Sequence, residues 1–219
     1  MSFDISSKNL TSLVGIEFPP NITQLNCYNN QLTSLKGCPN SVTELYCYNN
    51  ELTSLEGCPG LVTILQCDSN QLTSLEGCPG SVTELYCCDN RLTSLEGCPG
   101  SVIKLYCYDN QLTSLEGCPG SVTILYCDSN RLTSLEGCPN SVTKLYYYDN
   151  PLDKEYQSLS EDQIHQLNTK KAYIKGIRMI KSFIAAHKIR RCWRFYWYEE
   201  LDENGISRFC KMATKIYSP

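Results

Sequence analysis

A twenty-residue unit repeats along most of this 219-residue chain. The segment LTSLEGCPG begins at residues 52, 72, 92 and 112, and close variants begin at 32 and 132. The period continues without interruption from Ile22 to Leu152, which gives seven units. A unit this short cannot bury an apolar face alone, so the units must stack and share one core. The repeat therefore predicts a solenoid and argues against a conventional globular core.

Within each unit the residues follow the pattern V-x-x-L-x-C-x-x-N-x-L, as in Val42, Leu45, Cys47, Asn50 and Leu52. The Leu and the Cys are two positions apart, so on a short strand both point to the same face. The Asn amide can hydrogen-bond the backbone where the unit turns. The return path is too short for a helix, so we expect extended or 3₁₀ backbone there. Its Pro-Gly or Pro-Asn pair predicts a turn with positive φ after the proline.

This pattern resembles the leucine-rich repeat, L-x-x-L-x-L-x-x-N/C-x-L. The resemblance implies parallel strands on a concave side and an extended or 3₁₀ convex side. The short unit with a proline before the strand is similar to repeats of bacterial effectors, and P-x-S-V-T-x-L resembles the FNIP-type repeats of amoebae and giant viruses. Near-identical copies indicate recent expansion, which favours a viral protein. The resemblance implies a protein-interaction module or, as an alternative, an adaptor to host ubiquitination machinery.

The cysteines form two columns, which account for twelve of the fifteen. On the strands they are Cys27, Cys47, Cys67, Cys87, Cys107 and Cys127, and before the turn proline they are Cys38, Cys58, Cys78, Cys98, Cys118 and Cys138. Tyr147 replaces cysteine in the last strand and Phe18 replaces it before Pro19. Aromatic substitutes suit an apolar position, so we expect buried free thiols with no metal and no cofactor. Cys88 stands outside both columns, and we expect it to face solvent and to be the most reactive thiol of the array.

Tyrosine dominates the outward-facing strand positions. Nine of them fall in two neighbouring columns: Tyr28, Tyr46, Tyr48, Tyr86, Tyr106, Tyr108, Tyr126, Tyr146 and Tyr148. Tyrosine is enriched in binding hot spots. An edge of Asn and Asp side chains beside the tyrosines favours a basic or amphipathic protein partner. The alternative is that the tyrosines only stabilise neighbouring strands.

The charge distribution separates two parts of the chain. Residues 1–150 contain 6 basic and 15 acidic side chains, so 13 of the 19 basic and 8 of the 23 acidic ones lie in 151–219. We predict an N-terminal cap at 1–21, a leucine-rich-repeat solenoid at 22–153 and a basic helical C-terminal cap at 154–219. Residues 160–163, SEDQ, predict a helix start, and the isoleucine spacing predicts a helix from about 169 to 189. We expect its isoleucines, with the following aromatics, to cover the last repeat, and Asn204-Gly205 predicts a hairpin.

The basic tail provides a function from another class. Basic and aromatic side chains alternate there, which suits nucleic acid or another anionic surface. The candidate anion-binding residues are Lys181, Lys188, Arg190, Arg191 and Arg194. No catalytic arrangement of residues is present, so we expect no enzyme activity. We find no signal-peptide pattern and no membrane-spanning segment, and with many free thiols this predicts a cytoplasmic location.

Overall fold

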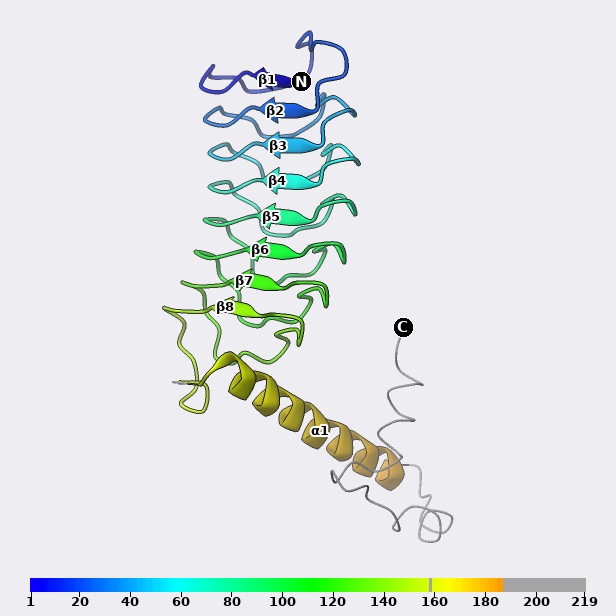
Figure 1. Cartoon of the computed structure of the whole chain (residues 1–219), viewed down its shortest axis with the longest axis vertical. Helices are drawn as coiled ribbons and strands as arrows, with labels where there is room; N and C mark the ends of the chain where they lie inside the picture. Colours follow the sequence, from blue (N-terminus) through cyan, green and yellow to red (C-terminus); the bar gives the residue numbers. More distant parts are fainter. Residues whose placement is uncertain (158, 187–219) are drawn as a thin grey trace. The chain divides into compact units, whose positions relative to one another are not determined.

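The computed structural model describes residues 1–157 and 159–186. The chain divides into two compact units, residues 1–168 and residues 169–219. In the first unit eight short strands stack in chain order into one parallel sheet (Figure 1). They are β1 (Ser2–Asp4), β2 (Gln24–Asn26), β3 (Glu44–Tyr46), β4 (Ile64–Gln66), β5 (Glu84–Tyr86), β6 (Lys104–Tyr106), β7 (Ile124–Tyr126) and β8 (Lys144–Tyr146). Each strand with its return path is called a rung below.

The register of the sheet follows the sequence period. Leu45 pairs with Leu65 and Leu65 with Leu85, each twenty residues apart. The first step is longer, because Phe3 of β1 pairs with Leu25 of β2. The segment 1–21 therefore contributes a rung of its own. Its sequence signal is LTSL at residues 10–13, which repeats the LTSL of 52–55 but is followed by two extra residues before the next unit.

The core runs through the inside of the stack. In the third rung Val42, Leu45, Cys47, Leu52 and Leu55 are each 0% exposed, and the same positions are buried in the rungs that follow. Fully burying one such aliphatic side chain contributes roughly 1.5–3 kcal/mol. Since each rung covers its neighbours, this stabilisation exists only in the stack. The prediction of a solenoid with a shared core is confirmed.

The asparagine of each unit forms a ladder of hydrogen bonds to the backbone. Asn90 Nδ2 donates to the carbonyl oxygens of Cys87 at 3.2 Å and of Cys67, one rung earlier, at 3.1 Å. Its Oδ1 accepts from the Leu72 amide at 2.9 Å. One side chain thus satisfies buried peptide groups of two rungs, as the sequence predicts.

Positive φ occurs at a different glycine from the one we predicted. Gly97, three residues before the Gly of the Pro-Gly pair, has φ of 84°. Gly100, which follows Pro99, does not lie in the left-handed region and has open space where a Cβ would stand. The prediction was wrong because Pro99 is the first residue of its turn, and not a central residue followed by a left-handed glycine. The Val102 amide donates to the Pro99 carbonyl oxygen at 3.1 Å.

Gly97→Ala is therefore expected to lower the free energy of unfolding by about 2–3 kcal/mol. Alanine is strained in the left-handed conformation, and its Cβ would overlap the backbone of the preceding rung. A Cβ at Gly97 would lie 2.8 Å from the Glu76 backbone nitrogen on the preceding rung. Gly100→Ala is the matched control, and we expect less than about 0.5 kcal/mol of change. Urea unfolding measures both variants. Equal losses in the two variants would contradict this assignment.

The residues just before α1 (Glu161–Ala186), together with the first turn of this helix, cover the C-terminal end of the first unit. Ser160 and Gln163 form the predicted capping box: the Ser160 amide donates to Gln163 Oε1 at 2.9 Å and the Gln163 amide donates to Ser160 Oγ at 3.4 Å. The helix begins eight residues before the predicted start at 169. Residues 187–189 of the predicted helix and the predicted hairpin lie outside the described residues.

The side chains that close the core are Tyr156 and Ile164, both 0% exposed. The sequence analysis did not single them out. His165 Nε2 lies 3.0 Å from the Val142 carbonyl oxygen. In the preceding rung a serine has this role, since Ser141 Oγ donates to the Val122 carbonyl at 2.7 Å. The cap thus copies a contact of the repeat with a different residue. The predicted covering isoleucines from 174 onward belong to the second unit.

Candidate binding face

The outward strand positions bring four tyrosines into one continuous stack. Their ring centroids are 4.3 Å apart for Tyr86–Tyr106, 4.8 Å for Tyr106–Tyr126 and 4.0 Å for Tyr126–Tyr146. Neighbouring strands are about 4.8 Å apart, so rings on successive rungs meet at stacking distance. We call these four residues the tyrosine ladder. Each remains partly exposed.

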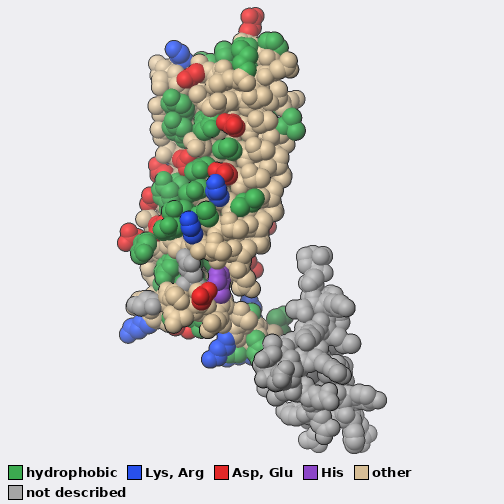
Figure 2. All heavy atoms as spheres, in the orientation of Figure 1, with side chains coloured by type: hydrophobic (Ala, Val, Ile, Leu, Met, Phe, Trp, Pro, Cys, Tyr) green, Lys and Arg blue, Asp and Glu red, His purple; other side chains and the backbone are tan. Residues whose placement is uncertain are grey.

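The other predicted tyrosines lie nearby but do not all join the ladder. Tyr28 stacks on Tyr48 with centroids 4.5 Å apart, at the N-terminal end. Tyr46 donates a hydrogen bond from its hydroxyl to Glu44 Oε2 at 3.1 Å. Tyr108 and Tyr148 are the most open of the nine, 39% and 71% exposed. Figure 2 shows hydrophobic side chains, a class that includes tyrosine, interspersed with acidic and basic ones along this part of the stack.

A third outward column carries charge and was missed by the sequence analysis. It contains Gln24, Glu44, Ile64, Glu84, Lys104, Ile124 and Lys144, two positions before the tyrosine column. Lys104 Nζ lies 2.8 Å from Glu84 Oε1 across adjacent rungs. We call the last six residues the charge column. Its signal is a longer period of sixty residues, in which Glu44, Ile64 and Glu84 correspond to Lys104, Ile124 and Lys144.

Cys88 is buried, which corrects the prediction that it faces solvent. It is 2% exposed, and its amide donates to Asp68 Oδ1 at 3.0 Å. The small side chain stands in a column between larger residues, Asp68 and Tyr108, which shield it. Burial, followed by the nearby Asp68 carboxylate, raises the pKa of the Cys88 thiol well above its ordinary value. A thiol with a raised pKa is a poor nucleophile at neutral pH.

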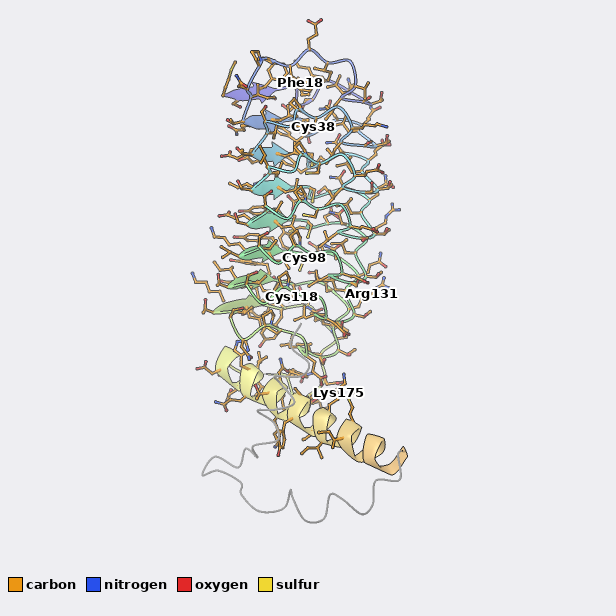
Figure 3. The ribbon with its side chains drawn as sticks, turned by 90° about the vertical axis from the view of Figure 1, so that its right-hand side faces the viewer. Phe18, Cys38, Cys98, Cys118, Arg131 and Lys175 are labelled. Atoms are coloured by element: carbon orange, nitrogen blue, oxygen red, sulfur yellow. The ribbon has the colours of Figure 1, made fainter. Side chains whose placement is uncertain are left out.

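The strand column of cysteines is buried in the core, as predicted. In the second column Cys38 and Cys138 are buried, whereas Cys58, Cys78, Cys98 and Cys118 are half-buried and pack against the core. The six strand cysteines are each 0% exposed. The thiols of Cys67, Cys87, Cys107 and Cys127 contact the next rung, with Cys67 Sγ 3.2 Å from the Tyr86 carbonyl oxygen. In the second column Phe18, Cys38, Cys98 and Cys118 follow one line along the stack (Figure 3). The described cysteines are free thiols. Burial raises the pKa of Cys38, Cys78 and Cys98 to about 12.

The described residues include no group of three or more His, Cys, Asp or Glu side chains arranged to hold a metal ion. They also include no helix with the length and apolar character needed to cross a bilayer. Of the candidate anion-binding residues, Lys181 lies within α1, and Lys188, Arg190, Arg191 and Arg194 lie outside the described residues.

Comparison with known proteins gives a structural match. No family model matches the chain, and no curated protein matches it. Among solved structures, YopM from Yersinia enterocolitica superimposes with a TM-score of 0.56 at 27% identity, over 62% of this chain and 30% of that one. This fold is a leucine-rich-repeat solenoid.

Two further solved structures match this chain at lower similarity. YopM from Yersinia pestis, described as a leucine-rich effector protein, has a TM-score of 0.49 at 25% identity, over 67% of this chain and 49% of that one. The functional domain of InlJ from Listeria monocytogenes, described as including a cysteine ladder, has a TM-score of 0.47 at 21% identity, over 68% of this chain and 39% of that one. This leucine-rich-repeat chain covers less than half of each matched chain.

Proposed function

We propose that this leucine-rich-repeat protein is a non-enzymatic interaction module that binds a protein through the outward face of its strands. The fold class is commonly used for protein interaction. The observation that carries the proposal is the tyrosine ladder, in which four stacked rings remain partly exposed. An aromatic surface of this kind on a soluble fold favours a binding role over a purely structural one.

A structural role for the stacked rings is compatible with a binding role and supports it. Rings that are already held by their neighbours lose little conformational freedom when a partner covers them, which lowers the entropic cost of association. The hydroxyls add hydrogen-bonding groups to this apolar area, and the Tyr86 hydroxyl already donates to Glu84 Oε2 at 3.4 Å. Buried free thiols also favour a reducing compartment such as the cytoplasm.

A second candidate is binding of nucleic acid or another anionic surface through the C-terminal part. The observation that favours it is the exposure of Lys170, Lys175 and Arg178 on the described turns of α1. Binding of this type would weaken steeply with salt, because phosphate contacts release counterions. Binding through tyrosines would depend on salt much less.

Affinity capture from a host-cell lysate, with nuclease treatment, tests the proposal. We expect the wild-type chain to retain a protein, and the variant Tyr86→Ala, Tyr106→Ala, Tyr126→Ala to lose at least about 10-fold of it. Tyr148→Ala removes the most exposed tyrosine, 71% open, with little risk to folding. We expect it to weaken retention by a smaller factor.

The control variant is Thr73→Ala, Thr93→Ala, Thr113→Ala, which changes three exposed side chains of the return path. It should retain the protein as the wild type does, and thermal melting should show that every variant is folded. Retention that survives the tyrosine substitutions would contradict the proposal. Retention abolished by nuclease would instead support the second candidate. A captured ubiquitin-ligase component would support the adaptor role.

A further inference from the structure

We propose that the partner of this face is a second copy of the same chain, packed face to face with its rungs in reverse order. This inference rests on the proposed function, because it uses the same surface. It comes from the order of charges in the charge column, which is antisymmetric about its centre: Glu44, Ile64, Glu84, Lys104, Ile124, Lys144. Reading the column from either end exchanges every acid for a base and leaves the isoleucines in place.

A two-fold axis that runs parallel to the strands, between β5 and β6, brings opposite charges of the two copies to face each other. The rotation turns two faces toward each other, keeps the strand direction and reverses the order of the rungs. Each column then faces its own reversed copy, which is the condition for an isologous interface. Glu44 meets Lys144 of the second copy, Ile64 meets Ile124, and Glu84 meets Lys104. The same pairs recur by symmetry.

The centre of the face suits this packing. Glu84 and Lys104 are paired at 2.8 Å within one chain, so at the axis two such pairs would form a ring of alternating charge. The tyrosine column brings Tyr86 opposite Tyr106 of the second copy. Side chains of the charge column are mostly half-buried, and Lys144 is exposed, so none has to leave the core to make these contacts.

The edge of the face limits the affinity. The same rotation places Asp89 opposite Asp109 of the second copy, and both are exposed. These carboxylates must stay solvated at the rim, where water and salt screen them. Six rungs at about 4.8 Å cover roughly 29 Å of stack. This is a small interface, so we expect a dissociation constant in the micromolar range.

Sedimentation equilibrium of the full chain, from about 1 to 300 μM, tests the inference. We expect the wild type to pass from monomer to dimer over this range. One double variant, Glu44→Lys with Glu84→Lys, makes every charged side chain of the column basic. A second double variant, Lys104→Glu with Lys144→Glu, makes every one acidic. Each variant alone should associate on the order of 100-fold more weakly, because attractive pairs become repulsive.

An equimolar mixture of the two variants should form a mixed dimer, and the variant with all four reversals should dimerise again. Circular dichroism shows whether each variant is folded. A wild-type chain that stays monomeric at 300 μM would overturn the inference. A dimer that tolerates each reversal, or a mixture that fails to associate, would do the same. Tyrosine-dependent capture of another protein by such a monomer would leave the proposed function standing.

Discussion

Raising the pH from 8 to 10 should unfold the solenoid under reducing conditions. Burial raises the pKa of the strand cysteines well above the ordinary thiol value, and neighbouring thiols raise it further. The folded chain therefore keeps these protons while the unfolded chain, with thiol pKa values of about 8.5, releases them. The buried thiols therefore cost no stability below about pH 8.5, and the free energy of unfolding falls as the pH rises above this value.

The size of this effect follows from the number of thiols. One pH unit above its unfolded pKa, each thiol that stays protonated in the fold lowers the free energy of unfolding by roughly 1.4 kcal/mol. The six strand cysteines together give a loss of about 8 kcal/mol at pH 9.5, which is comparable to the whole stability of a typical domain, about 5–15 kcal/mol. We expect the transition between about pH 9 and 10.

Urea unfolding at a series of pH values, with a thiol reductant present, measures the slope of stability against pH. The control is Cys67→Ala, Cys107→Ala, which removes two buried thiols. It should be less stable at pH 7, because it leaves two small cavities, yet it should lose less stability per pH unit. A slope unchanged by these substitutions, or a chain still folded at pH 11, would contradict buried protonated thiols.

Asn90→Ala should lower the free energy of unfolding by about 3 kcal/mol. The substitution removes the donor to the Cys67 and Cys87 carbonyl oxygens and the acceptor for the Leu72 amide. The two carbonyl oxygens still accept from Asn70 Nδ2 at 3.1 Å and Asn110 Nδ2 at 3.0 Å. The buried Leu72 amide is left without an acceptor, which costs about 1–3 kcal/mol, and the lost bonds add about 0.5–1.5 kcal/mol each. Since the ladder joins two rungs, the loss weakens their contact as well as the local turn.

Asn140→Ala is the matched control, because Asn140 is exposed in the return path and other units have glycine at this place. We expect a change below about 0.5 kcal/mol. Urea unfolding at pH 7 compares the two variants. A loss of less than about 1 kcal/mol for Asn90→Ala would show that the ladder contributes little to stability.

The features that recur in every unit were predictable from the sequence. Leu85 and Cys87 point inward because strand side chains alternate, and Asn90 must turn inward to satisfy the backbone. Aromatic replacement of cysteine at Tyr147 and Phe18 indicated an apolar environment. Burial of the strand cysteines, and packing of the second column against the core, agree with it. The tyrosine column also followed from alternation.

The features that depend on one neighbour were not predictable. Cys88 is shielded only because Asp68 and Tyr108 are large, which no single unit reveals. Position 97 has no room for a Cβ because the backbone of the preceding rung approaches it there, a contact between units. His165 closes the stack by replacing a serine of the repeat, and no periodicity extends to it.

Site-specific photo-crosslinking tests the central claim, that the tyrosine ladder is a protein-binding surface. A photoreactive phenylalanine analogue at position 126 lies on the ladder, and the same analogue at position 113 lies on the exposed return path. In cell lysate we expect a crosslinked protein, a second copy included, from position 126 and none from position 113. Crosslinks from position 113 alone, or from neither position, would contradict a binding role for the tyrosine ladder.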